Sequence, residues 1–276
     1  MIDVINLKKS FGDVEVLKGI NITINKGDIV AVIGPSGSGK STFLRCLNCM
    51  EDPTGGSIIF NGVDIADMKV DINQHRRHMG MVFQHFNLFN NMTVLDNIMM
   101  APLYLRCKDL KKAKRANFFK KEKNPITQTK EQIKKEVREQ AMNLLKKIGL
   151  EDKADVYPST LSGGQKQRIA IVRSLCMNPE IILFDEVTAA LDPEMVREVL
   201  DVILGLAKDG MTMLIVTHEM NFARQVANRI VFMDKGQIIE QAKPEDFFTN
   251  PTTDRAKTFL NILNYEPRGT NYEENI

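Results

Sequence analysis

The fold is decided by the stretch Ile29-Val30-Ala31-Val32-Ile33-Gly34-Pro35-Ser36-Gly37-Ser38-Gly39-Lys40-Ser41. Its first five residues form a continuous apolar run, which is typical of a strand buried on both faces of a sheet. The next eight match G-x-x-x-x-G-K-[ST], and a helix is expected from Lys40 to about Met50. Between a strand and a helix, glycines let backbone N–H groups turn inward, and the helix amino terminus adds partial positive charge. The stretch therefore predicts a phosphate-binding loop in which Lys40 reaches the β and γ oxygens and Ser41 ligates Mg²⁺.

Two further apolar runs end at polar side chains. Ile181–Phe184 is followed by Asp185 and Glu186, and Thr212–Val216 ends near His218. The carboxyl ends of parallel strands meet at one edge of a sheet, so we expect these side chains beside the phosphate-binding loop. A carboxylate in the position of Asp185 suits Mg²⁺, and an adjacent Glu186 suits orientation of an attacking water.

The rest of the chain predicts two other kinds of structure. Short runs at 2–7 and 20–24, separated by Gly12 and Gly19, indicate antiparallel strands. From about residue 86 to 177 the apolar residues recur at helical spacing. One helix is expected to end at Gly149, and its apolar face consists of Ile133, Val137, Ala141, Leu144, Leu145 and Ile148. We expect a folded domain over 1–264, in which a core of about 1–85 and 178–240 carries a helical subdomain of about 86–177. A polar tail follows at 265–276.

Charge is balanced overall but uneven along the chain. The 276 residues include 37 basic and 35 acidic side chains, a net charge of +2, so overall charge does not indicate a nucleic-acid partner. Between Arg106 and Arg138, however, 13 basic residues face 4 acidic ones. We interpret Lys108 to Lys130, which contains Pro125, as an exposed loop or a partly formed helix. A solvated loop, contact with anionic lipid headgroups and contact with a regulatory partner remain open.

The cysteine content and the hydropathy of the chain indicate the cellular compartment that we expect for it. Four irregularly spaced cysteines are too few for a disulfide framework, which fits a reducing compartment. Cys46 and Cys49 form a C-x-x-C without a second pair, which we interpret as incidental. The amino terminus lacks the apolar core of a secretory signal, and no apolar stretch approaches the roughly 18 to 20 residues that span a bilayer. Any membrane role is expected to depend on a partner.

A further group of motifs carries a family resemblance. Leu161-Ser162-Gly163-Gly164-Gln165 reads as the signature peptide of the ATP-binding cassette ATPases. In that family Gln84 matches the Q-loop, Ala190-Leu191-Asp192 the D-loop, and His218 the switch histidine. Phe11 occupies the place of the aromatic residue that stacks on adenine. The chain thus resembles this family from about residue 1 to 263.

The resemblance implies an α/β fold: a P-loop NTPase core with a parallel sheet, an antiparallel β subdomain and an inserted helical subdomain. It implies ATP and Mg²⁺ as ligands, with Ser41, Gln84 and Asp185 at the metal. Catalysis is expected to involve Lys40, Gln84, Glu186 and His218. The residues expected at the nucleotide are Phe11, Gly34, Pro35, Ser36, Gly37, Ser38, Gly39, Lys40, Ser41, Thr42, Ser162, Gly163, Gly164, Gln165 and Asp192.

The resemblance also implies partners. Two copies are expected to sandwich two ATP molecules head to tail, with the phosphate-binding loop of each facing residues 162–165 of the other. Integral membrane permease subunits, and indirectly an extracytoplasmic solute-binding protein, complete the expected assembly at the cytoplasmic face of the membrane. No nucleic-acid partner is expected.

Some stretches resemble a narrower group, the ATPase subunits of bacterial polar amino acid importers. These are residues 79–89, 93–98 and 210–220. Service to an importer or exporter of another solute is one alternative, and a soluble cassette ATPase acting on nucleic acid or ribosomes is another. One departure is Val187-Thr188-Ala189, where the family commonly has Pro-Thr-Ser, which affects the expected contacts of the D-loop.

Overall fold

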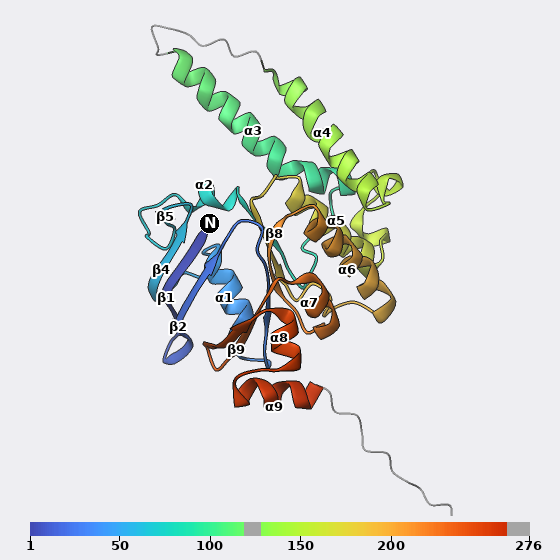
Figure 1. The fold of residues 1–276 in the computed structure, drawn as a ribbon. Helices are drawn as coiled ribbons and strands as arrows, with labels where there is room; N and C mark the ends of the chain where they lie inside the picture. The colour runs from blue at the N-terminus through green and yellow to red at the C-terminus, as the bar shows by residue number, and fades with distance from the viewer. Residues whose placement is uncertain (119–127, 264–276) are drawn as a thin grey trace, which may run out of the picture.

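The computed structural model describes residues 1–118 and 128–263, and Figure 1 shows their arrangement. A six-stranded sheet has the order β10-β9-β3-β8-β7-β6, in which only the edge strand β10 is antiparallel to its neighbour. Its strands are β3 (Ile29–Ile33), β6 (Met79–Val82), β7 (Ile181–Asp185), β8 (Thr212–Val216), β9 (Arg229–Asp234) and β10 (Gln237–Ala242). A second, antiparallel sheet has the order β2-β1-β4-β5 and consists of β1 (Ile2–Phe11), β2 (Val14–Ile24), β4 (Gly55–Phe60) and β5 (Val63–Asp64).

The central strands are buried at every position. All five residues of β3, of β7 and of β8 are buried, as their continuous apolar runs predict. Successive side chains of β7 point to opposite faces: Ile181 and Leu183 join the core beneath the antiparallel sheet, whereas Ile182 and Phe184 join the core on the other face. The sheet is therefore fixed by hydrophobic cores on both faces, which hold its carboxyl edge in place.

Helices cover these cores, and some of them form a separate core of their own. Around the parallel sheet lie α1 (Lys40–Leu47), α2 (Ile72–Arg76), α6 (Pro193–Lys208), α7 (Met220–Val226), α8 (Pro244–Thr249) and α9 (Asp254–Leu263). Between β6 and β7 the chain forms α3 (Val94–Phe118), α4 (Lys130–Lys147), the short 3-10 turns Glu151–Lys153 and Pro158–Thr160, and α5 (Gly163–Leu175). These helices share a separate core that includes Ile98, Val137 and Ile169. In the described part of the chain no helix is both long and apolar enough to cross a membrane.

The expected helix face is confirmed, whereas the two expected amino-terminal strands are longer than predicted. The expected face of α4 is confirmed at Ile133, Val137, Ala141 and Leu145, which are buried. The strands expected at 2–7 and 20–24 are longer and form a tight hairpin, in which Phe11 pairs with Val14 across Gly12. Gly19 lies within β2, opposite an irregularity of β1 at Asn6.

The described part of the basic segment agrees with one of the two expected forms, the partly formed helix. Residues 108–118 continue α3 as regular helix, so the loop alternative is wrong for them. Lys, Arg, Ala and Leu are good helix formers, and buried Leu110 anchors this part of α3. The expected break at Pro125 and the tail at 265–276 lie outside the described residues.

Candidate nucleotide-binding site

The phosphate-binding loop is shaped by two glycines. Gly34 directly follows β3 with φ 148°, and a Cβ there would lie 2.0 Å from the carbonyl oxygen of Met233. Gly39 has φ 97° and precedes the first residue of α1, where its carbonyl accepts from the N–H of Phe43. Only glycine adopts both conformations without strain or collision. The loop therefore closes over the amino terminus of α1, which suits an anion.

The site lies where four strands end side by side. In the sheet Val32 of β3 pairs with Val216 of β8, and Val216 also pairs with Asp185 of β7. Phe184 of β7 pairs with Val82 of β6, two residues before Gln84. The topology therefore brings the loop, His218, the two carboxylates and Gln84 to one edge of the sheet, as expected from the sequence.

Lys40 turns back under its own loop. Its side chain is only 4% exposed, and Nζ donates to the carbonyls of Gly34 (3.0 Å) and Pro35 (3.1 Å). Glu186 Oε1 lies 4.0 Å from the same Nζ. Burial lowers the pKa of Lys40, and the charges of Glu186 and Asp185 partly oppose that shift.

Glu186 has a second cationic or hydrogen-bonding neighbour. Its Oε1 lies 3.0 Å from Nε2 of His218, which follows β8. The backbone of Glu186 is in the left-handed region with φ 49°, and its N–H donates to the carbonyl of Val216. That rare conformation aims the carboxylate along the sheet edge toward Lys40.

Asp185 fits a metal ligand. It is 3% exposed, and its Oδ2 lies 3.4 Å from Nη2 of Arg45 on α1. Its Oδ1 is buried and has no hydrogen-bond partner in the described part of the chain. A buried carboxylate oxygen without a partner is costly, and a hard cation held by oxygen ligands would satisfy it. Ser38 Oγ in the loop is likewise buried without a hydrogen-bond partner among the described residues.

A pocket of about 470 Å³ opens over the loop. Seven of its lining residues belong to the expected site: Ser36, Gly37, Gly39, Lys40, Ser41, Thr42 and Glu186. The eighth, Val16 of β2, was not predicted by any sequence motif. Phe11 is not among the lining residues. Its ring is half exposed at the end of β1, with the ammonium of Lys9 4.6 Å from the ring centroid.

The signature peptide lies away from that pocket, since none of residues 162–165 lines it. Ser162 caps α5: its Oγ accepts from the N–H of Gln165, and the Gln165 side chain accepts from the N–H of Ser162. A Cβ on Gly163 would lie 3.0 Å from Leu191, so the signature peptide packs against the expected D-loop. Asp192 precedes α6 and its side chain makes no capping bond.

The departure at 187–189 leaves the carboxylates in place. Val187 is 4% exposed and joins the core on the α6 face of the sheet. The turn continues with backbone bonds from Ala189 to Glu186 and from Leu191 to Thr188. An apolar Val187 is therefore accommodated by packing.

Two side chains of α5 hold the segment around Gln84, and sequence reasoning missed both. Fully buried Gln167 donates to the carbonyl of Phe83 (3.0 Å). Arg173 donates to the carbonyls of Asn87 (2.6 Å) and Phe86 (3.4 Å). The acceptors are backbone carbonyls, which every residue has, so no sequence pattern predicts these hydrogen bonds. The helix that begins at the signature peptide is thus bonded directly to the chain after β6.

The C-x-x-C pair is buried in the core. Burial raises the pKa of Cys46 to about 12 and that of Cys49 to about 11. Both thiols therefore stay protonated at neutral pH, which is unlike a thiolate metal ligand or a redox nucleophile.

Comparison with known proteins agrees with this geometry. The ABC transporter family model matches residues 17–189. The glutamine transport ATP-binding protein GlnQ of Geobacillus stearothermophilus is 53% identical over 94% of this chain and 98% of its own length. The arginine transport ATP-binding protein ArtM of Bacillus subtilis is 52% identical over 94% and 98%.

Solved structures show the same fold. The ATP-binding cassette MJ0796, in a dimeric post-hydrolysis state bound to ADP and Pi, has a TM-score of 0.71 and 34% identity, covering 88% of this chain and 99% of its own. CbiO1 of Clostridium perfringens, part of the ABC transporter complex cbiONQ, has a TM-score of 0.71 and 28% identity over 95% and 94%. The expected fold class is confirmed, and the chain belongs to the ABC transporter family.

Proposed function

We propose that this chain is the ATP-hydrolysing, energy-coupling subunit of an importer for polar amino acids. The observation that carries the proposal is the meeting of Lys40, Asp185, Glu186 and His218 at one sheet edge, in a chain about half identical to amino acid transport subunits over nearly its full length. The relatives named above serve glutamine and arginine, which supports the polar amino acid class.

The proposed chemistry assigns one task to each side chain. Lys40 exchanges the carbonyls of Gly34 and Pro35 for phosphate oxygens, while the loop N–H groups and α1 bind the same anion. Glu186 orients and polarises the attacking water, and His218 holds that carboxylate and reaches the γ-phosphate. Gln84 contributes at the same edge from the end of β6. Phe11 stacks on the adenine.

Ser41 and Asp185, with Gln84, would hold Mg²⁺. The unpartnered Oδ1 of Asp185 supports this assignment. When bound there, Mg²⁺ would neutralise the charge that develops on the phosphate oxygens. Arg45 keeps the other oxygen of Asp185 engaged, so the free oxygen is directed into the site.

Residues 162–165 and Asp192 act on the nucleotide of a second copy. Ser162 is exposed at the amino terminus of α5, where backbone N–H groups favour an anion. Their distance from this chain's own pocket and the dimeric state of a solved relative support a head-to-tail sandwich.

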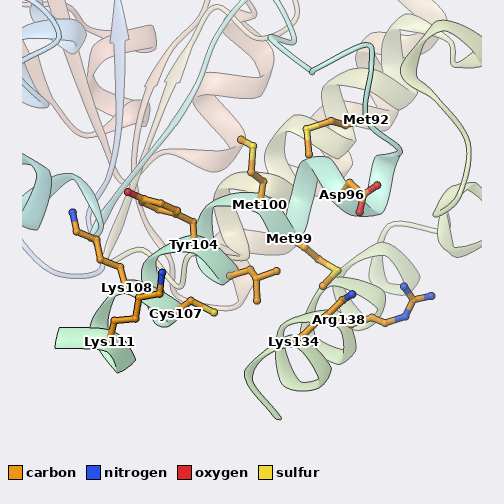
Figure 2. A pocket seen from close by; sticks show the side chains of 11 residues that line it. Met92, Asp96, Met99, Met100, Tyr104, Cys107, Lys108, Lys111, Lys134 and Arg138 are labelled. Carbon is orange, nitrogen blue, oxygen red and sulfur yellow. The ribbon is translucent and has the colours of Figure 1, made fainter. Parts of the chain in front are cut away.

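We also propose that a permease contacts the helical subdomain along α3. A groove of about 370 Å³ between β6 and α3 includes Phe89 and Met100. A second groove of about 610 Å³, between α3 and α4, includes Met100 and Tyr104 (Figure 2). Phe89, Met100 and Tyr104 are 45%, 37% and 63% exposed, an apolar patch suited to an amphipathic helix of a partner.

Because Arg173 lines the first groove and bonds the chain after Gln84, a partner seated there can influence the nucleotide site. In this proposal the subunit lies at the cytoplasmic face of the membrane and is held there by its partner. An extracytoplasmic solute-binding protein would act on it only through the permease.

The test is uptake of labelled glutamine, arginine and glutamate in cells in which the gene is disrupted. Restoration by the wild-type gene, and not by the Glu186→Gln variant, is the expected result. Purified wild-type protein should hydrolyse ATP. Hydrolysis without any effect on polar amino acid uptake would contradict the solute class, and absence of hydrolysis would contradict the ATPase assignment.

A further inference from the structure

The helices α3 and α4 continue past the second groove and project from the body of the molecule (Figure 1). We call residues 108–115 and 128–138 the arm. Leu110 and Ile133 are 8% and 1% exposed and belong to the core of the helical subdomain. Arg106 and Glu136 form an ion pair between the two helices. The arm is thus a packed helical hairpin, and its position is set by that core.

The arm carries a large excess of positive charge. It has nine basic side chains, all of them exposed, and three acidic ones. The basic residues are Lys108, Lys111, Lys112, Lys114, Arg115, Lys130, Lys134, Lys135 and Arg138, and the acidic residues are Asp109, Glu131 and Glu136. Two of the three carboxylates are already engaged, Asp109 by Arg77 (2.8 Å) and Glu136 by Arg106. Of the nine cations, Lys135 pairs with Glu139 (4.0 Å), so most of the excess is not neutralised by an ion pair within the described part of the chain.

The side chains exposed on the arm indicate which class of partner it binds. Between Lys111 and Arg115 every side chain is exposed and none is aromatic. Binding of single-stranded nucleic acid relies on aromatic rings that stack on bases, and the residues that define the arm, 108–115 and 128–138, include no aromatic residue. A diffuse array of exposed ammonium and guanidinium groups is instead complementary to a surface of fixed negative charge, such as a bilayer containing anionic lipids.

The location of the arm supports the same partner. Lys108, Lys111, Lys134 and Arg138 line the groove shown in Figure 2, and the other arm cations lie on the same two helices. A membrane protein seated in that groove would bring the arm close to the bilayer. Residues 108–115 lie in the distal part of α3 and extend the arm by about 12 Å along the helix axis.

We propose that the arm binds anionic phospholipid headgroups at the membrane surface, an inference that rests on the proposed contact of the α3 grooves with a permease. The interaction is electrostatic, because the described arm surface beyond Leu110 offers no exposed large apolar side chain for insertion. It is therefore sensitive to salt.

The experiment is sedimentation of the purified full-length protein with vesicles of phosphatidylcholine, alone or with about 30% phosphatidylglycerol. An arm variant carries Lys112→Gln, Lys114→Gln, Arg115→Gln and Lys130→Gln, none of which lines a groove. A control variant removes the same charge elsewhere, with Lys18→Gln, Lys26→Gln, Lys208→Gln and Lys243→Gln, all exposed. Thermal melting and ATP hydrolysis establish that both variants are folded.

The wild-type protein should bind phosphatidylglycerol vesicles at least about tenfold more tightly than phosphatidylcholine vesicles at about 0.15 M salt, and lose that preference at about 0.5 M. The arm variant should lose about tenfold in affinity and the control variant less than about twofold. Equal binding to both vesicles, equal losses in both variants, or displacement of the vesicles by a duplex RNA that binds the arm more tightly would overturn the proposal. These vesicles contain no permease, so intact vesicle binding together with unchanged amino acid uptake after gene disruption would contradict the proposed function alone.

Discussion

Nε2 of His218 lies 3.0 Å from Oε1 of Glu186, although the two residues are 32 positions apart in the chain. The contact exists because β8 and β7 are parallel neighbours that end together, with Asp185 opposite Val216. The same Glu186 oxygen is 4.0 Å from Nζ of Lys40. A single carboxylate thus links the phosphate-binding loop to the end of β8, and we expect its orientation to affect catalysis.

Replacing His218 should disturb that orientation without emptying the nucleotide site. His218→Ala removes a partner of Glu186 and is expected to lower ATP hydrolysis by about 10²-fold, with ATP affinity little changed. Single-turnover hydrolysis and nucleotide binding measure the two effects separately. His78→Ala, which removes an ion pair with Glu180 remote from the loop, is the control and should hydrolyse ATP normally. Normal hydrolysis by His218→Ala would exclude a role for this histidine.

The affinity for ATP should depend on pH through Lys40. Burial lowers the pKa of this ammonium, whereas bound phosphate favours its charged form. Above the lowered pKa, binding must take up a proton, so affinity for a non-hydrolysable ATP analogue should fall as pH rises from about 7 to about 10.

Lys40→Ala supplies the control for this titration. The variant should bind the analogue more weakly at every pH and should lose the alkaline fall in affinity, because the titrating group is gone. It should also have no measurable ATP turnover. An alkaline fall of the same size in Lys40→Ala would assign the titration to another group.

Arg173 should matter more for coupling than for hydrolysis itself. Arg173→Ala removes the donors to the carbonyls of Phe86 and Asn87 and is expected to lower the free energy of unfolding by about 1.5–3 kcal/mol. Basal ATPase activity should stay within about twofold of wild type, whereas stimulation by the permease should be lost, since the carbonyls lie between the groove and Gln84.

The matched control is Arg197→Ala, an exposed arginine on α6. Detergent-solubilised permease complexes containing each variant give the stimulated rate, and isolated subunits give the basal rate. If Arg173→Ala is stimulated as strongly as Arg197→Ala, the bonds to the chain after β6 serve only stability.

Much of the site could be predicted because its residues follow strong local patterns. The strands Ile29–Ile33 and Thr212–Val216 are confirmed to the residue, since runs buried on both faces leave little freedom for their ends. The loop between β3 and α1 was equally clear, because its spacing needs glycines at defined positions. Local sequence predicts structure best where local chemistry is most constrained.

Other features depend on contacts that are remote in sequence. The pairing of Arg45 with Asp185 spans 140 positions, and no spacing rule connects them. The strand β6 was not recognised, because Met79-Gly80-Met81-Val82 is short and contains a glycine. That glycine packs so closely against Ser174 and Ile182 that they leave no room for a side chain. For the basic segment the sequence leaves both loop and helix open, because its charge pattern is typical of a solvated stretch, whereas the burial of Leu110 stabilises the helix. Tertiary packing decided these cases.

The final prediction concerns Glu186 and the second copy of the chain. Glu186→Gln keeps the size of the side chain and its capacity to hydrogen-bond with His218 but removes the negative charge that polarises water. Hydrolysis should fall by about 10²- to 10⁴-fold while ATP binding persists. Because ATP held by Lys40 of one chain would be shared with Ser162 of the other, the variant should accumulate as a dimer with Mg-ATP, seen by size-exclusion chromatography.

Ser162→Arg in the Glu186→Gln background tests the sandwich. The exposed Ser162 caps α5, so an arginine there introduces bulk and removes the cap, and the ATP-dependent dimer should disappear. Thr129→Arg is the matched control, since Thr129 is an exposed cap of α4 in the helical subdomain and lines no groove near the nucleotide. It should dimerise with ATP as the Glu186→Gln parent does. A Glu186→Gln protein that dimerises equally without nucleotide, or a Ser162→Arg protein that dimerises normally with it, would contradict ATP sharing between the two chains.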